Sequence, residues 1–325
     1  MASPVSRAWG RWSSAFLLAL LALGLARAVA LAWVCDDSFI SFRYAESLLE
    51  GRGLVYNAGE RVEGYTNLSW TLLIALAMRL GFEPVAASEA LGIACYLGLV
   101  GALVGFALRR SRLTDLPFVP LSAALVLVLD DFHAWATGGL ETMLFTWLAT
   151  YGILSTRRSV PTARRAAATG AVLALAILTR PDGLIFAVAA VASYWLTAGA
   201  DVRRRALGAS LITVLPIAIV VAGLVAFKLA YYGEIFPTAF FSKSVVRPYP
   251  SQGLVYLGLY LAKNWFLAPA LVAALILSRR AAAPASVSGL ARLSTPVFLV
   301  GTAALFIGYV VHSGGDFMFA RRLIP

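Results

Sequence analysis

Charged residues are scarce in this chain, and their scarcity indicates its class. Asp, Glu, Lys and Arg together make up 13% of the 325 residues, whereas 60% of the residues are hydrophobic. An ordinary soluble domain has about 25% charged residues. The composition therefore predicts an integral membrane protein and argues against a soluble enzyme.

Cysteine and histidine are almost absent, with two residues of each kind. Cys35 follows the first long apolar run and Cys95 lies inside another, so a disulfide between them is not expected. His133 and His312 are too few for a histidine-rich metal site. The sequence therefore argues against a disulfide and excludes a histidine-rich metal centre.

Long apolar runs are what the chain has in abundance. A membrane-spanning helix needs about 20 apolar residues, and nine segments approach or reach that length. The strong candidates are residues 13–34, 86–108, 206–228, 254–277 and 294–312. The weaker or shorter ones are residues 116–130, 140–155, 166–179 and 183–198.

Arginines gather in short loops between these segments, within a formal net charge of +11. They alternate with loops that carry carboxylates, as the excess of basic residues in cytoplasmic loops predicts. The charge therefore indicates orientation in the membrane and disfavours nucleic-acid binding. The clustered arginines are Arg7, Arg11, Arg109, Arg110, Arg112, Arg157, Arg158, Arg164, Arg165, Arg203, Arg204, Arg205, Arg279, Arg280 and Arg292.

This orientation leaves five polar segments on the outer side of the membrane. The apolar stretch 68–80 is too short to span the bilayer comfortably, so we expect it to form a helix lying along the outer interface. No linker or repeat divides the chain, which predicts one membrane domain over residues 1–325. The end at Leu323-Ile324-Pro325 suggests a piece of a longer protein. The polar segments are residues 36–67, 130–141, 179–183, 231–247 and 314–322.

The adjacent carboxylates Asp36 and Asp37 are the strongest indication of chemistry, because a charge at the membrane face is costly unless it is solvated, paired or used. A carboxylate can accept the proton of an attacking hydroxyl. Arginine or lysine can hold a donor phosphate, and aromatic rings such as Tyr44, Tyr56 and Trp70 can line a sugar site. The pattern favours transfer of a sugar from a lipid-phosphate donor, with inversion in a single displacement.

Three runs of the first polar segment carry a more specific resemblance: residues 36–46 (DDSFISFRYAE), 51–57 (GRGLVYN) and 63–67 (EGYTN). They resemble the first outer loop of polyprenyl-phosphate-sugar-dependent glycosyltransferases of the C superfamily. The nearest group is the terminal arabinofuranosyltransferases of the actinobacterial cell wall and their bacterial relatives. Later segments resemble the family in the same order, namely residues 138–142, 179–183, 233–243 and 314–318.

The resemblance implies an all-α, multi-span bundle of the glycosyltransferase C type, with juxtamembrane helices on the first outer loop. It implies a bacterial inner-membrane protein whose active site faces outward. The donor would be a polyprenyl-phosphate-linked sugar and the acceptor a hydroxyl of a glycan, lipid or protein. The acids leave the participation of a divalent cation open. The expected catalytic residues are Asp36 and Asp37, and the expected substrate-binding residues are Arg43, Tyr44, Glu141, Arg180, Lys243, Asp316 and Arg322.

Several of these residues also have a structural interpretation. Asp36 and Asp37 could cap a helix start, and Glu141 could be a buried carboxylate bonded to the amides near Gly138 and Gly139. Arg43 could pair with an acid of its own loop. The remaining alternatives are an Arg180–Asp182 pair and an interfacial position for Lys243 and Arg247. Asp130, Asp131 and His133 could form a cation site, but a wet loop is the favoured interpretation, and Asn67-Leu68-Ser69 fits a glycosylation sequon.

Two other functions compete with glycosyl transfer. A transporter or flippase of a lipid-linked saccharide predicts polar residues on both membrane faces and repeated spans, neither of which the chain shows. A non-catalytic assembly factor of the envelope or of a flagellar machine needs no acidic doublet. Glycosyl transfer accounts for more of the sequence.

Overall fold

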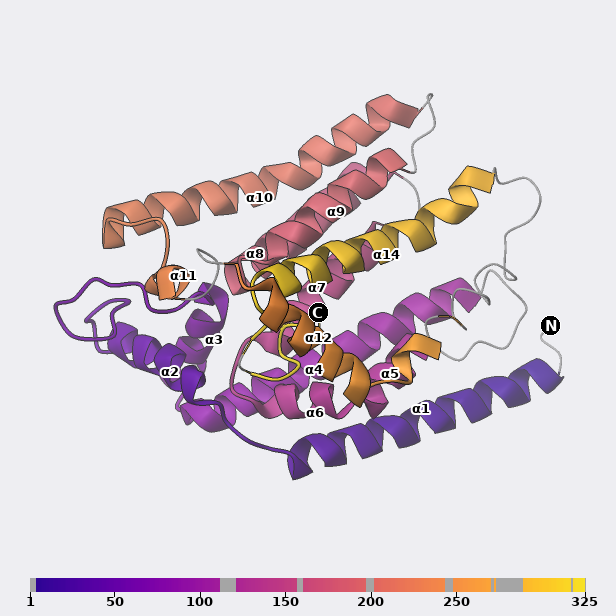
Figure 1. The fold of residues 1–325 in the computed structure, drawn as a ribbon, viewed down its shortest axis with the longest axis horizontal. Coiled ribbons are helices and arrows are strands. Elements are labelled where there is room, and N and C mark those ends of the chain that lie inside the picture. The colour runs from indigo at the N-terminus through magenta and orange to yellow at the C-terminus, as the bar shows by residue number, and fades with distance from the viewer. Residues whose placement is uncertain are drawn as a thin grey trace. The chain divides into compact units, whose positions relative to one another are not determined.

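The chain folds into helices throughout the part that the structure describes (Figure 1). The structure is a computed structural model that describes residues 4–111, 121–156, 160–196, 202–242, 248–269, 272, 289–316 and 318–324. Thirteen helices and no strand occur within these ranges. The predicted all-α class is therefore confirmed.

The helices of the first half are α1 (Pro4–Ala30), α2 (Asp36–Leu49), α3 (Leu68–Arg79), α4 (Pro84–Ser111), α5 (Leu121–Val128), α6 (Asp130–Thr137) and α7 (Thr142–Ser155). Those of the second half are α8 (Ala163–Thr179), α9 (Gly183–Leu196), α10 (Arg203–Tyr232), α11 (Thr238–Ser242), α12 (Pro250–Lys263) and α14 (Gly289–His312). The chain divides into two compact units within α7, unit 1 up to Tyr151 together with Ile324, and unit 2 over Gly152–Leu323. The prediction of one domain stays a prediction.

In unit 1, α1 packs against α5 and α6, and α4 packs against the same two helices. Arg27 of α1 is exposed and links α1 to α6 at the surface, since its guanidinium donates to both carboxylate oxygens of Asp130 at 2.8–3.0 Å. The α2–α3 pair lies side by side and joins the rest of the unit through contacts of α3 with α4. This pair carries the first polar segment.

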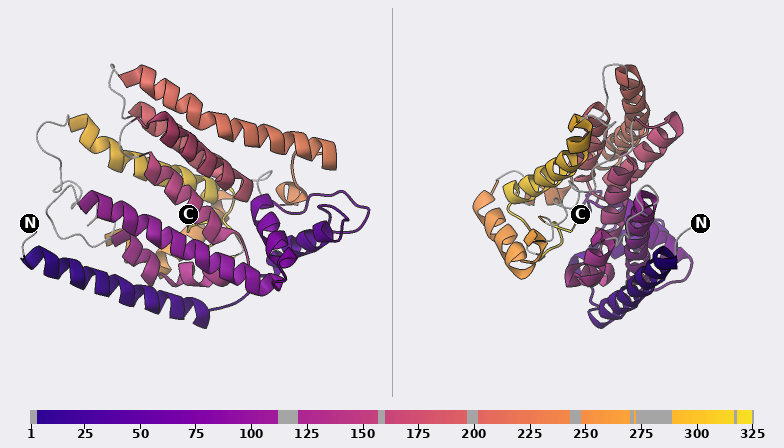
Figure 2. Two further views of the ribbon diagram at one scale, coloured as in Figure 1. Left: turned by 180° about the vertical axis from the view of Figure 1, so that it is seen from behind. Right: turned by 90° about the vertical axis from the view of Figure 1, so that its right-hand side faces the viewer.

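In unit 2, α8 packs against α9 and α10. Helix α9 also packs against α14, and α14 packs against α12 (Figure 2). The α8–α10 crossing is close because it occurs at Gly170, where a Cβ would lie 2.2 Å from the carbonyl oxygen of Thr213. Small residues allow helix backbones to approach in this way. The Thr213 hydroxyl also donates to the Ala166 carbonyl across the same crossing at 3.2 Å.

Local sequence explains where the helices that flank the polar segments end. Arg180 precedes a proline and has an extended backbone, with φ −153° and ψ 135°, so α8 ends at Thr179. Gly233 follows α10 with φ 78°, a left-handed conformation that glycine adopts at little cost, and its N–H caps the carbonyls of Lys228 and Leu229. The predicted polar segments at 179–183 and 231–247 thus begin at real helix ends.

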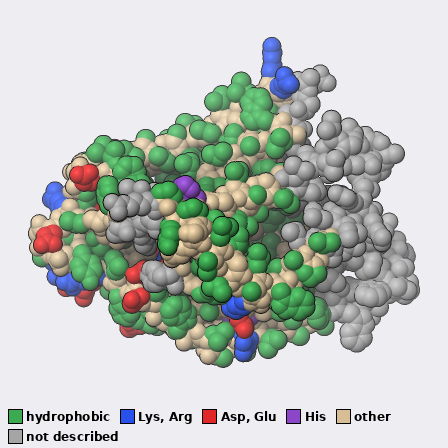
Figure 3. Space-filling model, in the orientation of Figure 1, with side chains coloured by type: hydrophobic (Ala, Val, Ile, Leu, Met, Phe, Trp, Pro, Cys, Tyr) green, Lys and Arg blue, Asp and Glu red, His purple; other side chains and the backbone are tan. Residues whose placement is uncertain are grey.

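Two helices among the described residues are long and apolar enough to cross a membrane, within Pro84–Leu108 and Arg203–Tyr232. The apolar window of α10 is only 17% buried, which a core helix of a soluble protein would not be. Leu207, Leu211, Leu215 and Ile219 of α10 are all about half exposed or more, and hydrophobic side chains cover much of the face seen in Figure 3. These features are consistent with a helical membrane protein.

The other predicted spans form helices of different lengths. Predicted spans 13–34 and 294–312 lie in α1 and α14, of 27 and 24 residues, and 166–179 lies in α8, of 17 residues, whereas 140–155 and 183–198 correspond to α7 and α9, of 14 residues each. A helix of 14 residues is about 21 Å long, less than the roughly 30 Å hydrocarbon core. The expected interfacial segment is also helical, as α3, although its position at an interface stays a prediction.

Two predicted spans differ from the structure. The prediction of one helix over 254–277 is wrong, because α12 ends at Lys263 and Asn264 caps it with φ −109° and ψ 40°. Of the predicted span 116–130, residues 121–128 form α5, a break follows at Leu129, and residues 112–120 lie outside the described part. The mean hydropathy of the sequence does not reveal such helix breaks, because the residues on both sides of each break are apolar.

Candidate functional site

The acidic doublet forms the first turn of α2. Cys35 occupies the N-cap position without a side-chain capping bond, so neither aspartate is the cap itself. Both carboxylates lie where the helix dipole stabilises negative charge. Asp36 is exposed, whereas Asp37 is half-buried. Because successive side chains on a helix diverge by about 100°, the two acids have different surroundings, as expected.

The carboxylate of Asp36 is oriented by its neighbours. Its Oδ1 accepts from the backbone N–H of Asp37 at 2.9 Å and from the thiol of Cys35 at 3.3 Å. Burial, together with the hydrogen bond to Asp36, raises the pKa of Cys35 to about 11. The thiol therefore stays protonated at neutral pH and serves as a donor to Asp36 and not as a nucleophile.

A tight turn before α7 docks against this helix start. The N–H of Cys35 donates to the carbonyl of Gly138 at 3.1 Å, and the indole of Trp70 donates to the carbonyl of Gly139 at 3.0 Å. Gly139 has φ 78°, and a Cβ there would lie 2.9 Å from the side chain of Ser38. The turn carries Glu141, so α2, α3 and Glu141 are brought together within unit 1.

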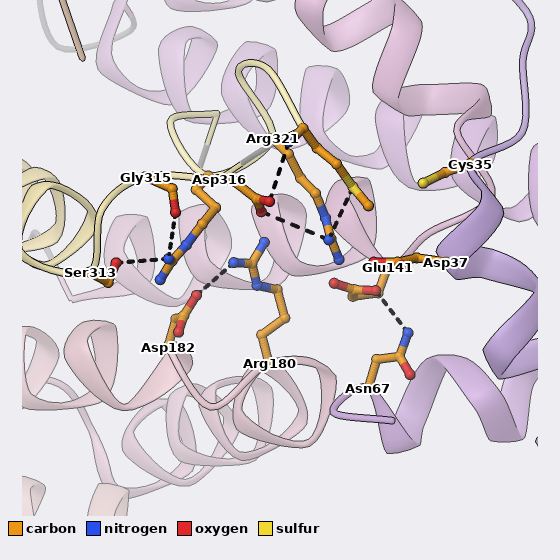
Figure 4. A network of polar contacts seen from close by, with 12 residues as sticks. Cys35, Asp37, Asn67, Glu141, Arg180, Asp182, Ser313, Gly315, Asp316 and Arg321 are labelled. Carbon is orange, nitrogen blue, oxygen red and sulfur yellow. Dashed lines mark hydrogen bonds and ion pairs between the residues drawn. The ribbon is translucent and has the colours of Figure 1, made fainter. Parts of the chain in front are cut away.

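Glu141 is 1% exposed, and its carboxylate accepts a hydrogen bond from Asn67, which is not among the predicted site residues. The amide Nδ2 of Asn67 donates to its Oε2 at 2.8 Å (Figure 4). Asn67 also contacts the hydroxyls of Ser41 and Thr71 at 3.1–3.2 Å. The predicted alternative of a buried Glu141 is correct in its burial, with an asparagine amide as one of its donors.

The same contacts bear on the sequon. Asn67 is 5% exposed, and its amide nitrogen points at Glu141 and not at solvent. Attachment of a glycan would displace this hydrogen bond and require the side chain to leave the interior. The folded chain therefore does not present Asn67 as a glycosylation acceptor.

The other expected residues of the first loop are held by their own segment. Arg43 donates to Glu46 at 2.6 Å and to the carbonyl of Tyr56 at 3.2 Å, as the pairing alternative predicts. Tyr44 is 1% exposed, and its hydroxyl donates to the carbonyl of Val62 at 2.7 Å while accepting from the N–H of Gly64 at 2.8 Å. Its buried ring supports the loop, and a substrate contact by Tyr44 stays a prediction.

Of the three aromatic residues expected at a sugar site, Trp70 is fully buried and Tyr56 is 46% exposed. Trp70 therefore supports the turn before Glu141, and Tyr56 is the more accessible ring.

Unit 2 has a second polar cluster, in the turn between α8 and α9. Arg180 donates to Asp182 at 2.6 Å, and both side chains are 9% exposed. The hydroxyl of Tyr309 on α14 donates to the other carboxylate oxygen of Asp182 at 2.8 Å. Burial by itself would raise the pKa of Asp182, but the charges of Arg180 and Arg322 and the Tyr309 hydrogen bond lower it below its ordinary value. Asp182 is therefore an anion at neutral pH.

The segment after α14 adds two further arginines to this cluster. Arg322 donates to the hydroxyl of Ser313 at 2.8 Å and to the carbonyl of Gly315 at 3.1 Å, and its guanidinium lies 5.0 Å from the ring centroid of Tyr309. Arg321 is 9% exposed and lies 3.9 Å from a carboxylate oxygen of Asp316 (Figure 4). The segment after α14 therefore places Arg321 and Arg322 in the polar cluster of unit 2.

The cluster in unit 2 brings several guanidinium groups together. Arg180, Arg321 and Arg322 lie there with the carboxylates of Asp182 and Asp316. Guanidinium groups are the donors best suited to bind an oxyanion such as a phosphate.

The remaining predictions concern Lys243, the segment 130–133 and a possible metal site. Lys243 lies outside the described residues, as does Arg247. The alternative of a wet loop at 130–133 is wrong, because α6 buries Asp131 and His133 to 5% and 1% exposure. Within the described part of the chain, no three His, Cys, Asp or Glu side chains lie close enough together to hold a metal ion.

Sequence reasoning overlooked Asn67, Tyr309 and Arg321 as members of these clusters. Asn67 lies in the run 63–67, where the sequence marks it only as part of a sequon. Tyr309 lies within a predicted span, where nothing marks it as a partner of a residue 127 positions earlier. Arg321 lies in the polar segment 314–322, where no feature of the sequence distinguishes it from Arg322.

Comparison with known proteins agrees with the resemblance noted in the sequence. The chain is 29% identical over 330 residues to a protein of Mycobacterium tuberculosis named terminal beta-(1->2)-arabinofuranosyltransferase, and 90% of the chain is covered. It is also 29% identical over 326 residues to a protein of the same name from Corynebacterium glutamicum, again over 90% of the chain. The chain spans 50% and 46% of these relatives. No family model and no solved structure matches it.

Proposed function

We propose that this chain is a cell-envelope glycosyltransferase that moves a sugar from a polyprenyl-phosphate donor to a hydroxyl acceptor. The observation that carries the proposal is the likeness to two named arabinofuranosyltransferases over 90% of the chain. The acidic doublet at the start of α2 and the arginine cluster of unit 2 support it, because they supply the two kinds of group that the reaction needs.

The acidic doublet supplies the base. One of Asp36 and Asp37 accepts the proton of the acceptor hydroxyl as its oxygen attacks the anomeric carbon of the donor sugar. The bond from that carbon to the phosphate oxygen breaks in the same displacement, and the phosphate leaves with the electron pair. The configuration at the anomeric carbon is inverted, and no covalent sugar–protein intermediate forms. The other aspartate orients the acceptor or a neighbouring group.

The arginine cluster binds the phosphate of the donor. Arg180 and Arg322 provide guanidinium donors whose orientation is set by Asp182, Ser313 and Gly315. Developing negative charge on a leaving phosphate is stabilised by such fixed donors. Asp316 and Lys243 complete the proposed donor-binding residues, while Arg43 and Glu141 are proposed to contact the sugar or the acceptor.

The setting is proposed to be the inner membrane of a bacterium. The chain spans it several times as a bundle of the glycosyltransferase C type, with α2 and α3 as juxtamembrane helices of the outer loop and the acidic doublet facing outward. The alternation of arginine clusters with acidic loops supports this orientation. The acceptor is a glycan, lipid or protein of the envelope.

Sugar transfer by the purified protein tests the proposal. Wild-type protein in lipid nanodiscs is given a polyprenyl-phosphate sugar with a labelled sugar group and an envelope acceptor extract, and the labelled product is counted. Transfer should occur with wild type and be abolished in the double variant Asp36→Asn/Asp37→Asn. Equal transfer by both proteins, or uptake of the labelled lipid into vesicles without a covalent product, would contradict the proposal.

A further inference from the structure

We infer that Asn67 is a positioning residue that holds the carboxylate of Glu141 in one orientation for the reaction. The inference rests on the proposed function, and it adds a residue and a role that the acidic doublet and the arginine cluster do not include. It begins from the contact between the amide Nδ2 of Asn67 and Oε2 of Glu141, 2.8 Å long and buried on both sides.

The chemistry of the two side chains determines how the amide is turned. A carboxylate oxygen accepts hydrogen bonds and does not donate them, so the amide atom that faces Glu141 is the nitrogen. The amide oxygen of Asn67 then lies 3.2 Å from the hydroxyls of Ser41 and Thr71, each of which can donate to it. Every polar atom of the Asn67 side chain therefore has a partner, and a flip of the amide would place an oxygen against the carboxylate.

These partners connect Glu141 to the helix that begins with the acidic doublet. Ser41 lies on α2, the helix that starts at Asp36, and Thr71 lies in the first turn of α3. The turn before Glu141 is in addition bound to Cys35 and Trp70. Asn67 thus joins α2, α3 and Glu141 in one buried network, as a side chain that supports a reactive group should do.

The identity of the donor matters as much as its position. Asn67 offers a hydrogen bond without a positive charge, so it orients Glu141 without cancelling the negative charge of the carboxylate. A guanidinium in the same place would do both, as Arg180 does for Asp182. We therefore assign Asn67 to orienting the Glu141 carboxylate through a hydrogen bond that adds no positive charge.

The decisive variant is Asn67→Asp, which keeps the shape and replaces the donor by a second carboxylate about 3 Å from the first. At neutral pH the two anions repel, and transfer should fall about 10- to 100-fold relative to wild type. On acidification a proton shared by the two carboxylates restores a hydrogen bond. The ratio of variant to wild-type transfer should therefore rise as the pH is lowered from 7.5 towards 5.5.

Two controls separate this behaviour from general loss of stability. Asn67→Ala removes the donor without adding a charge, so its loss of transfer should not recover at low pH. Asn264→Asp places a carboxylate at another buried asparagine, whose amide donates to the carbonyl of Tyr260 at 3.2 Å in unit 2; because Asn264 is not among the proposed site residues, transfer by the folded variant should stay near that of wild type at both pH values.

Thermal unfolding tests the contact without any substrate. Asn67→Asp should melt at a lower temperature than wild type at pH 7.5, and the difference between the two melting temperatures should become smaller as the pH is lowered. In the double variant Asn67→Asp/Glu141→Gln one donor again faces one acceptor, so its melting temperature at pH 7.5 should exceed that of Asn67→Asp while transfer stays low.

The outcomes distinguish the inference from the proposed function. An Asn67→Asp variant with wild-type transfer at neutral pH, or with a loss that does not change with pH, overturns the inference while the proposed function stands. Wild-type protein that transfers no sugar overturns the proposed function, and with it the role given to Asn67. The melting series still establishes in that case whether Asn67 and Glu141 are in contact.

Discussion

The two polar clusters hold their carboxylates in opposite ways. In unit 1, Glu141 receives its hydrogen bond from a neutral amide, and Asp36 receives its bonds from a backbone N–H and a thiol. In unit 2, Asp182 faces the guanidinium of Arg180 and lies near Arg322. A neutral donor orients a carboxylate without adding a positive charge, whereas an arginine also brings a cation to it. The comparison therefore sets the anion cluster of unit 1 (Asp36, Asp37 and Glu141), which we propose to be reactive, against the cation cluster of unit 2 (Arg180, Arg321 and Arg322), which we propose to bind the donor phosphate.

The largest expected effect lies in the anion cluster. Asp36→Asn and Asp37→Asn should each fold, because their side chains are not buried in the core. The variant that removes the base should lose about 10²- to 10⁴-fold in sugar transfer, and the other should lose at least about tenfold less. Single-turnover transfer rates at pH 7.5 measure the difference. Equal, small losses in both would mean that the anion cluster is not the reactive one.

Breaking the buried ion pair of the cation cluster should mainly cost stability. Arg180→Gln leaves Asp182 buried without its nearest cation, which typically lowers the free energy of unfolding by about 3–5 kcal/mol. The double variant Arg180→Gln/Asp182→Asn should lose less, because no charge is stranded. Denaturant unfolding in a mild detergent measures both. A single variant as stable as wild type would show that Asp182 does not depend on this arginine.

Acid should weaken the cation cluster through Asp182. Its pKa is lower in the folded chain than the ordinary value of 3.8, so its contribution to stability is complete above that value and is lost as the pH falls through the folded pKa. Wild type should therefore lose stability below about pH 4, and Asp182→Asn should lose less over the same range. Melting temperatures between pH 5 and pH 2.5 test this, and parallel curves would contradict it.

Two glycines offer the most evenly matched comparison and the smallest effects. Gly139 and Gly315 have φ values of 78° and 77°, and a Cβ at either would lie within 3 Å of a neighbouring side chain, Ser38 and Tyr256 respectively. An alanine at either position should cost about 1–3 kcal/mol of stability. Gly139→Ala should lower the rate of transfer by shifting Glu141, and Gly315→Ala should raise KM for the lipid donor by shifting Arg322. Identical effects on rate and KM would remove the distinction between the clusters.

Much of the helical framework could be predicted from the sequence. The apolar runs indicate α1, α4, α7, α8, α9, α10 and α14, and the predicted polar segments at 179–183 and 231–247 begin where α8 and α10 end. The failure at 254–277 has a local cause, because α12 stops at Asn264 within a run of apolar residues. Hydropathy cannot detect such a stop.

The site was predictable only in part. Asp36 and Asp37 stand out because two charges interrupt an apolar chain, and the Arg180–Asp182 pair lies within three residues. Asn67 and Glu141 are 74 positions apart, and Tyr309 and Asp182 are 127 apart. No local pattern links such residues.

The sequence by itself determined the helical class, the candidate membrane helices and the residue types available for chemistry, because apolar length and charge are properties of short segments. Only the tertiary structure decided which neutral or charged donor meets each carboxylate. Hydrogen bonds and ion pairs act over about 3 Å, and the packing of helices distant in sequence sets which side chains come within that reach.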